Sequence, residues 1–187
     1  MCLFHPPPNF KGFAKLTNLN LHRTIFDPAI FSNLISKCPL LESLRLFRCT
    51  NCDILEIDAA NLKFLDFLGT SKSICFKNAP MLKIVTVWLS SQDLIGPSLI
   101  YPNLTKFFHY MPSLEELELS GSTLKYLALG SLPESPPTAL NNVKSLCVNE
   151  MSLGNLEEVS GAVYLIINCS KLQELTIDCA SSLLYSH

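Results

Sequence analysis

The stretch "CPLLESLRLFRC", residues 38–49, decides the fold. Its leucines Leu41, Leu44 and Leu46 follow the spacing Leu-x-x-Leu-x-Leu. Alternation with a period of two predicts a short strand with one buried face, on which Leu44 and Leu46 point inward while Arg45 points outward. The stretch is therefore either one half-buried strand of an ordinary domain or one unit of a repeat.

The same spacing recurs along the chain. Seven copies are found, with valine, isoleucine or phenylalanine in some slots: "LTNLNL", "LESLRL", "LKFLDF", "LKIVTV", "LEELEL", "VKSLCV" and "LQELTI", which start at residues 16, 41, 62, 82, 114, 143 and 172. The starts are separated by 25, 21, 20, 32, 29 and 29 residues. A leucine pattern at intervals of this length is typical of a solenoid, in which each unit buries its apolar face only against its neighbours.

We therefore predict an α/β fold, a leucine-rich-repeat solenoid of about seven repeats that forms a single domain over residues 1–187. Its strands stack as one curved parallel sheet, with helices and short strands on the convex side. Additional short strands are expected in "CDILEI" and "SICFKN", because the repeats there leave little room for a helix. "STLKYLALG", residues 122–130, follows the fifth repeat too closely for another full turn and is interpreted as a further strand.

Three longer connections have a helical period. Residues 27–38 contain Asp27 as an expected N-cap and Pro28 in the first turn. Residues 102–111 and 154–169 are the other two predicted helices. The side chains expected to point inward are Ile30, Phe31, Leu34, Ile35 and Cys38 in the first helix, Leu104, Phe107, Phe108 and Met111 in the second, and Leu156, Val159, Val163, Ile166 and Ile167 in the third.

Composition limits the classes of function. The chain of 187 residues is 48% apolar and 16% charged, with a net charge of −2, so no basic field favours nucleic acid or an anionic membrane. The longest apolar run, residues 162–167, is far shorter than the roughly 20 residues of a membrane span. The first residues lack the pattern of a secretory signal, so a cytoplasmic or nuclear location is expected.

The residues that could carry chemistry do not converge. Only Cys49 and Cys52 form a close pair among eight cysteines, and the four histidines are scattered, so we expect reduced thiols and no metal site. Cys49 occupies the slot where leucine-rich repeats turn an Asn or Cys inward. No phosphate-binding glycine loop and no nucleophile beside a base is found. We predict no enzyme, no catalytic residue and no cofactor.

The chain, in the order of its repeat stretches, resembles the leucine-rich-repeat region of plant F-box/FBD/LRR proteins. The resemblance rests on "FKGFAKLTNLNL", "LISKCPLLESLRLFRC", "ILEIDAANLKFLDFLG", "ICFKNAPMLKIV", "MPSLEELEL" and "ALNNVKSLCVNEMSLGNLEEVSGAVYLIINCSKLQELTI", and it covers nearly the whole chain. It implies substrate recognition in a cullin-type ubiquitin ligase, in which the repeats hold the target and an F-box recruits the Skp-family adaptor.

Two modules of that family, the F-box before the repeats and the FBD module after them, are not expected in this chain. The repeats begin directly after "MCLFHPPP", and the Leu-Pro signature of an F-box is matched only by Leu132-Pro133, which runs into prolines. The chain ends at His187, soon after the seventh repeat. Adaptor and cullin are therefore expected as partners only of a longer form, and a stand-alone scaffold or a truncated product without ligase recruitment is the alternative.

The outward positions of the strands predict the binding face. Solvated faces of sheets are normally polar, yet the middle repeats place apolar and aromatic residues there, beside one basic and several acidic side chains. An aromatic anchor with a charged rim is typical of a protein interface. The predicted protein-binding residues, for a target that the sequence does not identify, are Arg45, Phe47, Phe64, Asp66, Leu68, Ile84, Thr86, Trp88, Glu116 and Glu118. Trp88 is expected to contribute most. Neither end resembles a polar cap, so exposed core side chains are expected at the ends.

Overall fold

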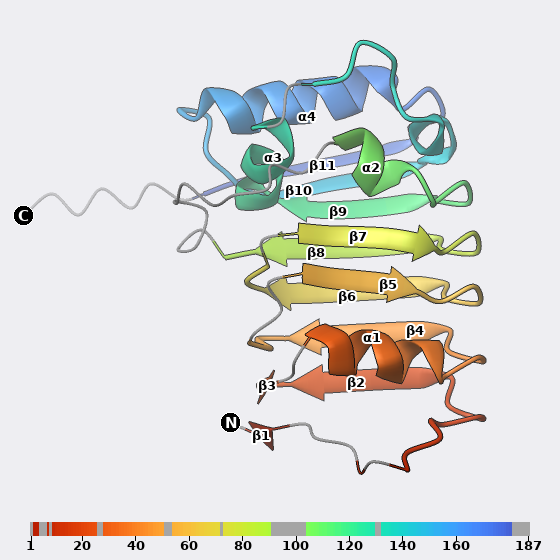
Figure 1. The fold of residues 1–187 in the computed structure, drawn as a ribbon. Helices are drawn as coiled ribbons and strands as arrows, with labels where there is room; N and C mark the ends of the chain where they lie inside the picture. Colours follow the sequence, from red (N-terminus) through yellow and green to blue (C-terminus); the bar gives the residue numbers. More distant parts are fainter. Residues whose placement is uncertain are drawn as a thin grey trace, which may run out of the picture.

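The computed structural model gives the arrangement of most of the chain (Figure 1). The residues that the structure describes are 2–3, 7, 9–25, 28–50, 54–71, 73–90, 104–129 and 132–180. Asp27, predicted to cap the first helix, and Cys52 lie outside them.

Within these residues, the central feature is a parallel sheet of seven strands in the order β11-β10-β9-β8-β6-β4-β2. Its strands are β2 (Asn18–His22), β4 (Ser43–Phe47), β6 (Phe64–Gly69), β8 (Ile84–Leu89), β9 (Glu116–Ser120), β10 (Ser145–Met151) and β11 (Glu174–Cys179). Each Leu-x-x-Leu-x-Leu stretch contributes one strand, and the strands stack in order along the molecule (Figure 1). The predicted fold class, a leucine-rich-repeat solenoid, is confirmed.

One face of this sheet is buried by the chain that returns between strands. The short strands β5 (Ile54–Asp58) and β7 (Ser73–Asn78) pair with each other in parallel behind the middle of the sheet. Helices α1 (Pro28–Ser36), α2 (Leu104–Phe108), α3 (Gly121–Ala128) and α4 (Leu156–Asn168), with the 3-10 helix η2 (Thr138–Asn142), cover the remainder. At the N-terminal end, β1 (Cys2–Leu3) pairs with β3 (Thr24–Ile25).

The core lies between these two layers. Along each of the first six repeats the inward residues are buried or partly buried; Leu44 and Leu46 of β4, for example, have no exposed surface. The inward faces predicted for α1 and α2 are confirmed for Phe31, Leu34 and Ile35 and for all four residues of the second helix, whereas Ile30 is only partly buried. Cys49 is buried as well, and its thiol lies 3.5 Å from the carbonyl oxygen of Leu21, in the neighbouring repeat.

The strand predicted in residues 122–130 is wrong, because residues Gly121–Ala128 form α3. Ser120 caps this helix: its side chain accepts a hydrogen bond from the backbone N–H of Thr123 at 3.2 Å. Leu124 and Leu127, spaced by three residues, then lie on one helical face and are buried. The capped turn satisfies backbone groups that an extended chain would leave without partners at this position.

The inward face predicted for the third helix is wrong for three of its five residues. In α4, Leu156, Val163 and Ile167 are exposed, whereas Val159 and Ile166 are partly buried and pack against the core. The buried residues are Glu158, Gly161, Ala162, Leu165 and Cys169.

Small side chains explain the rotation of α4. A Cβ atom at Gly161 would lie 3.3 Å from the carbonyl oxygen of Leu124, so α4 approaches α3 closely where Gly161 has no side chain. The Glu158 carboxylate, on the same face, accepts a hydrogen bond from the backbone N–H of Ser152 at 2.7 Å. This packing leaves Leu156, Val163 and Ile167 of α4 on the outside.

We predict that Leu156→Gln and Ile167→Gln, alone or together, change the free energy of unfolding by no more than about 0.5 kcal/mol each, the usual range for exposed positions. Leu156 is 78% exposed and Ile167 is 71% exposed, so little apolar burial is lost. Urea denaturation followed by circular dichroism measures this difference. A loss of about 2 kcal/mol for either change would mean that the face predicted from the sequence is the buried one after all.

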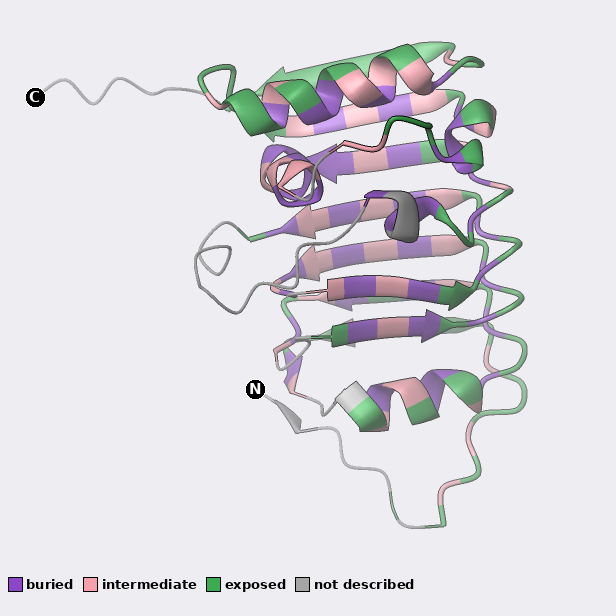
Figure 2. Ribbon diagram, turned by 45° about the horizontal axis from the view of Figure 1, so that its top comes forward, coloured by how far each residue is buried: buried purple, intermediate pink, exposed green. Residues whose placement is uncertain are grey.

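The C-terminal repeat is the least covered part of the described chain. All six residues of β11 are exposed, including Leu175 and Ile177, which occupy the core positions of earlier repeats (Figure 2). Together with the outer face of α4 they form an exposed apolar surface beside the last described strand. None of the helices in the described residues is long and apolar enough to cross a membrane.

Candidate protein-binding groove

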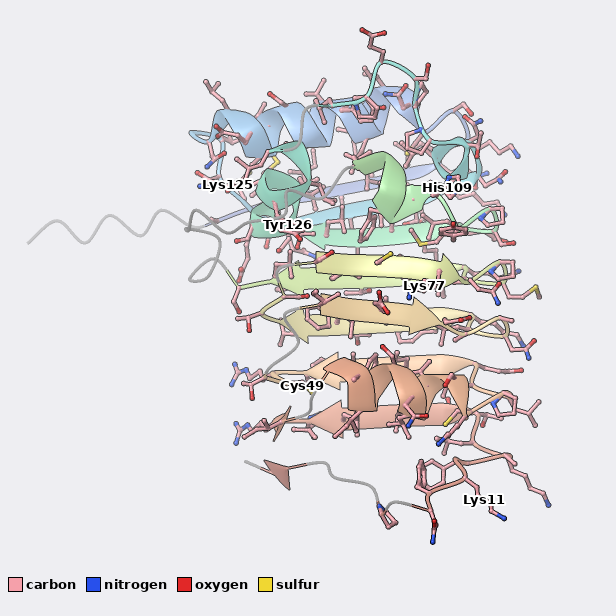
Figure 3. The ribbon with its side chains drawn as sticks, viewed as in Figure 1. Lys11, Cys49, Lys77, His109, Lys125 and Tyr126 are labelled. Atoms are coloured by element: carbon pink, nitrogen blue, oxygen red, sulfur yellow. The ribbon has the colours of Figure 1, made fainter. Side chains whose placement is uncertain are left out.

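A groove of about 570 Å³ crosses the sheet face opposite the described helices. It is lined by Phe47, Phe64, Asp66, Leu68, Ile84, Thr86, Trp88, Glu116 and Glu118, from strands β4, β6, β8 and β9. We call it the Trp88 groove. Lys77 on β7 and Tyr126 on α3, labelled in Figure 3, belong to the layer on the opposite side of the sheet. The structure thus brings nine of the ten predicted residues into one depression, and Arg45 lies beside it.

Parallel pairing in register produces this arrangement. Asp66 of β6 pairs with Thr86 of β8, and Thr86 pairs with Glu118 of β9. Residues two positions earlier and two positions later along the strands pair in the same way, for example Phe64 with Ile84 and Leu68 with Trp88. Because successive side chains alternate between faces, every second residue of each strand lies on the open face, and residues at equivalent positions of successive repeats form one column there.

Aromatic stacking organises the side of the groove nearest the N-terminus. The guanidinium of Arg45 lies 4.8 Å from the centre of the Phe64 ring, a cation–π contact. The rings of His22 and Phe47 stack with their centres 4.9 Å apart and an interplanar angle of 25°. Arg45 therefore forms the rim of the groove rather than its floor, and His22 acts as a ring that supports Phe47.

Hydrogen bonds orient the acidic side of the groove. The side-chain amide of Asn149 donates to one carboxylate oxygen of Glu118 at 2.7 Å, and the hydroxyl of Thr86 donates to the other at 3.3 Å. Asn149 lies on β10, outside the set of residues predicted for the site. The alternation places it on the open face, but the sequence does not indicate which neighbour its amide contacts.

Asp66 carries a carboxylate in an unfavourable environment. Desolvation by burial raises its pKa; the positive charge of Arg45 lowers it in part, and the charge of Glu118 raises it further. A carboxyl pKa that is higher in the folded than in the unfolded state means that folding favours the protonated form. The contribution of Asp66 to stability is therefore greatest below its unfolded pKa and is lost as the pH rises through its folded pKa. The ionised carboxylate thus lowers the free energy of unfolding.

A second hollow adjoins the groove at Trp88. It has a volume of about 350 Å³ and is lined by Leu68, Trp88, Leu89, Ser90, Ser120, Ser122 and Glu150. Leu68 and Trp88 are shared by the two hollows, so the indole stands between them. Ser122 and Glu150 were not predicted, because their positions depend on the turn into α3 and on the end of β10.

These groups are suited to non-covalent binding. In the part of the chain that the structure describes, no group of three or more His, Cys, Asp or Glu residues could hold a metal ion. The thiol of Cys147, next to Glu118 on the open face, has a pKa raised by desolvation and then by the Glu118 charge, the opposite of an activated nucleophile. What the open face offers is apolar and aromatic surface beside carboxylates.

The parallel sheet, its returning helices and its uncovered face define a leucine-rich-repeat domain, a class of protein-interaction repeat. The family model for the LRR repeats of FBD-associated F-box protein At5g56370 matches residues 1–177, so the chain belongs to this F-box/FBD/LRR family. It is similar to the F-box/FBD/LRR-repeat protein At1g13570 of Arabidopsis thaliana, with 34% identity over 179 residues. That match covers 94% of this chain and 42% of the relative, so the chain spans about two fifths of the relative's length. No solved structure gives a significant match.

Proposed function

We propose that this chain binds a target protein at the Trp88 groove and serves as the substrate-recognition part of an F-box-type cullin ubiquitin ligase subunit. The observation that carries the proposal is the groove itself, in which Trp88, Phe64 and Ile84 form an apolar surface on the open face of the sheet. Apolar surface of this kind, with an aromatic anchor and a polar rim, is typical of protein interfaces. The role is binding rather than catalysis, and family membership supports the link to the ligase.

We predict that Phe64→Asp/Trp88→Asp abolishes the capture of specific partners from plant extract. Each change places a charge where an apolar side chain would contact the target, so the loss should be about 100-fold or more in affinity, as for a hot-spot residue. Quantitative mass spectrometry of captured proteins measures it.

A matched control is Ile54→Asp, because Ile54 is an exposed apolar residue on β5, on the opposite side of the molecule. This variant should capture the same proteins as the unchanged chain. All variants are first shown to be equally folded by circular dichroism. Identical captures by the groove variant and the unchanged chain would contradict a binding role for the groove.

The ligase role needs a separate test. The chain is fused behind an F-box from another protein, and ubiquitination of a captured target is followed with purified adaptor, cullin and ubiquitin enzymes. We expect the target to be ubiquitinated by the fusion and not by the fusion that carries Trp88→Asp. A target that is bound but never modified would support the alternative, an interaction scaffold without ligase recruitment.

A further inference from the structure

The Trp88 groove carries an unbalanced charge. Three of its lining residues are acidic, Asp66, Glu116 and Glu118, and none is basic. Arg45 lies outside the lining and is engaged with the Phe64 ring at 4.8 Å. The groove is therefore negative when its carboxylates are ionised. The positive charge of Arg45 at the rim lowers the pKa of Asp66 and offsets part of this negative charge, whereas the charge of Glu118 raises that pKa.

Two of the acids, Asp66 and Glu118, lie between two apolar columns, whereas Glu116 continues the Phe64–Ile84 column on β9. On β6 the order is Phe64, Asp66, Leu68, and on β8 it is Ile84, Thr86, Trp88. Asp66 and Glu118 are on strands two apart, which separates their backbones by about 10 Å with Thr86 between them. A cationic group above Thr86 would thus lie about 5 Å from either strand. Its alkyl stem would run along β8 and contact either Ile84 or Trp88, which flank Thr86 on that strand.

The charge decides between possible occupants. A purely apolar ligand would bury carboxylates whose charge Arg45 and the hydrogen bonds to Glu118 compensate only in part, and burying a charge without full compensation is costly. An acidic ligand would be repelled. A lysine or arginine side chain avoids both penalties: its positive end pairs with the acids, its alkyl stem packs on apolar surface, and the indole adds a cation–π contact.

The surroundings of Glu118 and Asp66 suit such a partner for different reasons. Glu118 is held by Asn149 and Thr86, so its carboxylate is oriented before any ligand arrives. Asp66 is partly desolvated, and a cation would relieve that cost.

We propose that the Trp88 groove binds a lysine or arginine side chain of the target, flanked in the target by apolar residues that contact the Phe64–Ile84 and Leu68–Trp88 columns. The proposal rests on the proposed function, since it specifies the chemistry of the ligand at the same site.

Trp88 is the sole tryptophan of the chain, so its fluorescence reports directly on the groove. The full chain is titrated with short capped peptides that are identical except for a central Lys, Arg, Gln or Glu between two leucines. We expect saturable changes in emission with the Lys and Arg peptides, and about tenfold or more weaker binding of the Gln and Glu peptides. The preference should shrink as salt is raised, because the charges are partly exposed.

Two variants make the result specific. Asp66→Asn/Glu118→Gln should erase the preference for Lys and Arg while it leaves Trp88 and the fold in place. Glu42→Gln removes an exposed acid outside the groove, which pairs with Lys63 at 2.8 Å, and should keep the preference. Both variants are checked by circular dichroism before titration.

Equal binding of all four peptides, a preference that survives Asp66→Asn/Glu118→Gln, or no emission change with any peptide would each overturn the proposal. None of these results affects the proposed function, which depends on whether Phe64→Asp/Trp88→Asp loses its captured partners. If that variant also captures the same proteins as the unchanged chain, the groove itself is not the binding site.

Discussion

Replacing Phe76 by alanine should lower the free energy of unfolding by about 3 to 5 kcal/mol, the range for removing a large aromatic side chain from a packed core. Phe76, on β7, is fully buried. Its ring meets that of Phe107 on α2 edge to face, with centres 5.5 Å apart, and Phe107 meets Phe108 in the same way at 5.0 Å. The three rings connect the back of the middle repeats to the helix that precedes the fifth.

Urea denaturation followed by circular dichroism measures this effect. Cys75→Ala is the control, because Cys75 is adjacent on β7 and only partly buried, and a change of about 1 kcal/mol or less is expected there. A loss below about 1 kcal/mol for Phe76→Ala would be incompatible with a closed aromatic cluster between β7 and α2.

Thr123→Val should cost about 2 to 4 kcal/mol although it preserves the shape of the side chain, because two backbone groups lose their partner. The buried hydroxyl of Thr123 accepts from the backbone N–H of Leu89 at 3.0 Å and donates to the carbonyl oxygen of Val87 at 2.9 Å. The pairing of β8 with β9 ends at Val87, so the threonine hydroxyl supplies the partner that a longer β9 would provide.

The informative comparison is Thr123→Ser, which keeps the hydroxyl and loses only a methyl group. Serine should cost about 1 kcal/mol, clearly less than valine. Both losses are measured by urea denaturation. If serine proved the more harmful change, the contribution of Thr123 would lie in packing and not in its hydrogen bonds.

The sheet could be predicted from the sequence because each repeat of a solenoid packs against the next repeat along the chain. The order of the repeats therefore also determines which strands pair. Once the seven leucine stretches are aligned, parallel stacking in register follows, and with it the column shared by Asp66, Thr86 and Glu118. The errors fall where apolar spacing is ambiguous. Leu124, Leu127 and Leu129 satisfy Leu-x-x-Leu-x-Leu, but Leu124 and Leu127 also satisfy the three-residue spacing of a helix, and the Ser120 cap favours the helix.

The orientation of α4 shows a different limit. Apolar residues occur around most of this helix, so hydrophobic spacing does not define one face. The packing is decided by Gly161 and Ala162, which permit a close approach to α3, and by the bond that Glu158 accepts from Ser152. Close approach depends on which residues are small, a property that a search for large apolar residues overlooks.

For the groove, strand alternation was sufficient to predict which side chains share the open face. It could not predict the contacts between them. The bond from Asn149 to Glu118 depends on side-chain rotamers, and the second hollow beside Trp88 depends on where β9 gives way to α3.

The paired strands β5 and β7 also affect the bend of the molecule. Neighbouring strands are about 4.8 Å apart both in the large sheet and in the β5–β7 pair behind it. Packed helices, in contrast, need about 8 to 10 Å between their axes. Behind β6 and β8 the back of the solenoid is therefore as narrow as its front, and this section has little reason to bend. A helix-backed repeat is wider at the back and acts as a wedge. The part of the groove on β6 and β8 thus lies where the solenoid has least reason to bend, so an extended segment of a partner can cross these two strands without bending.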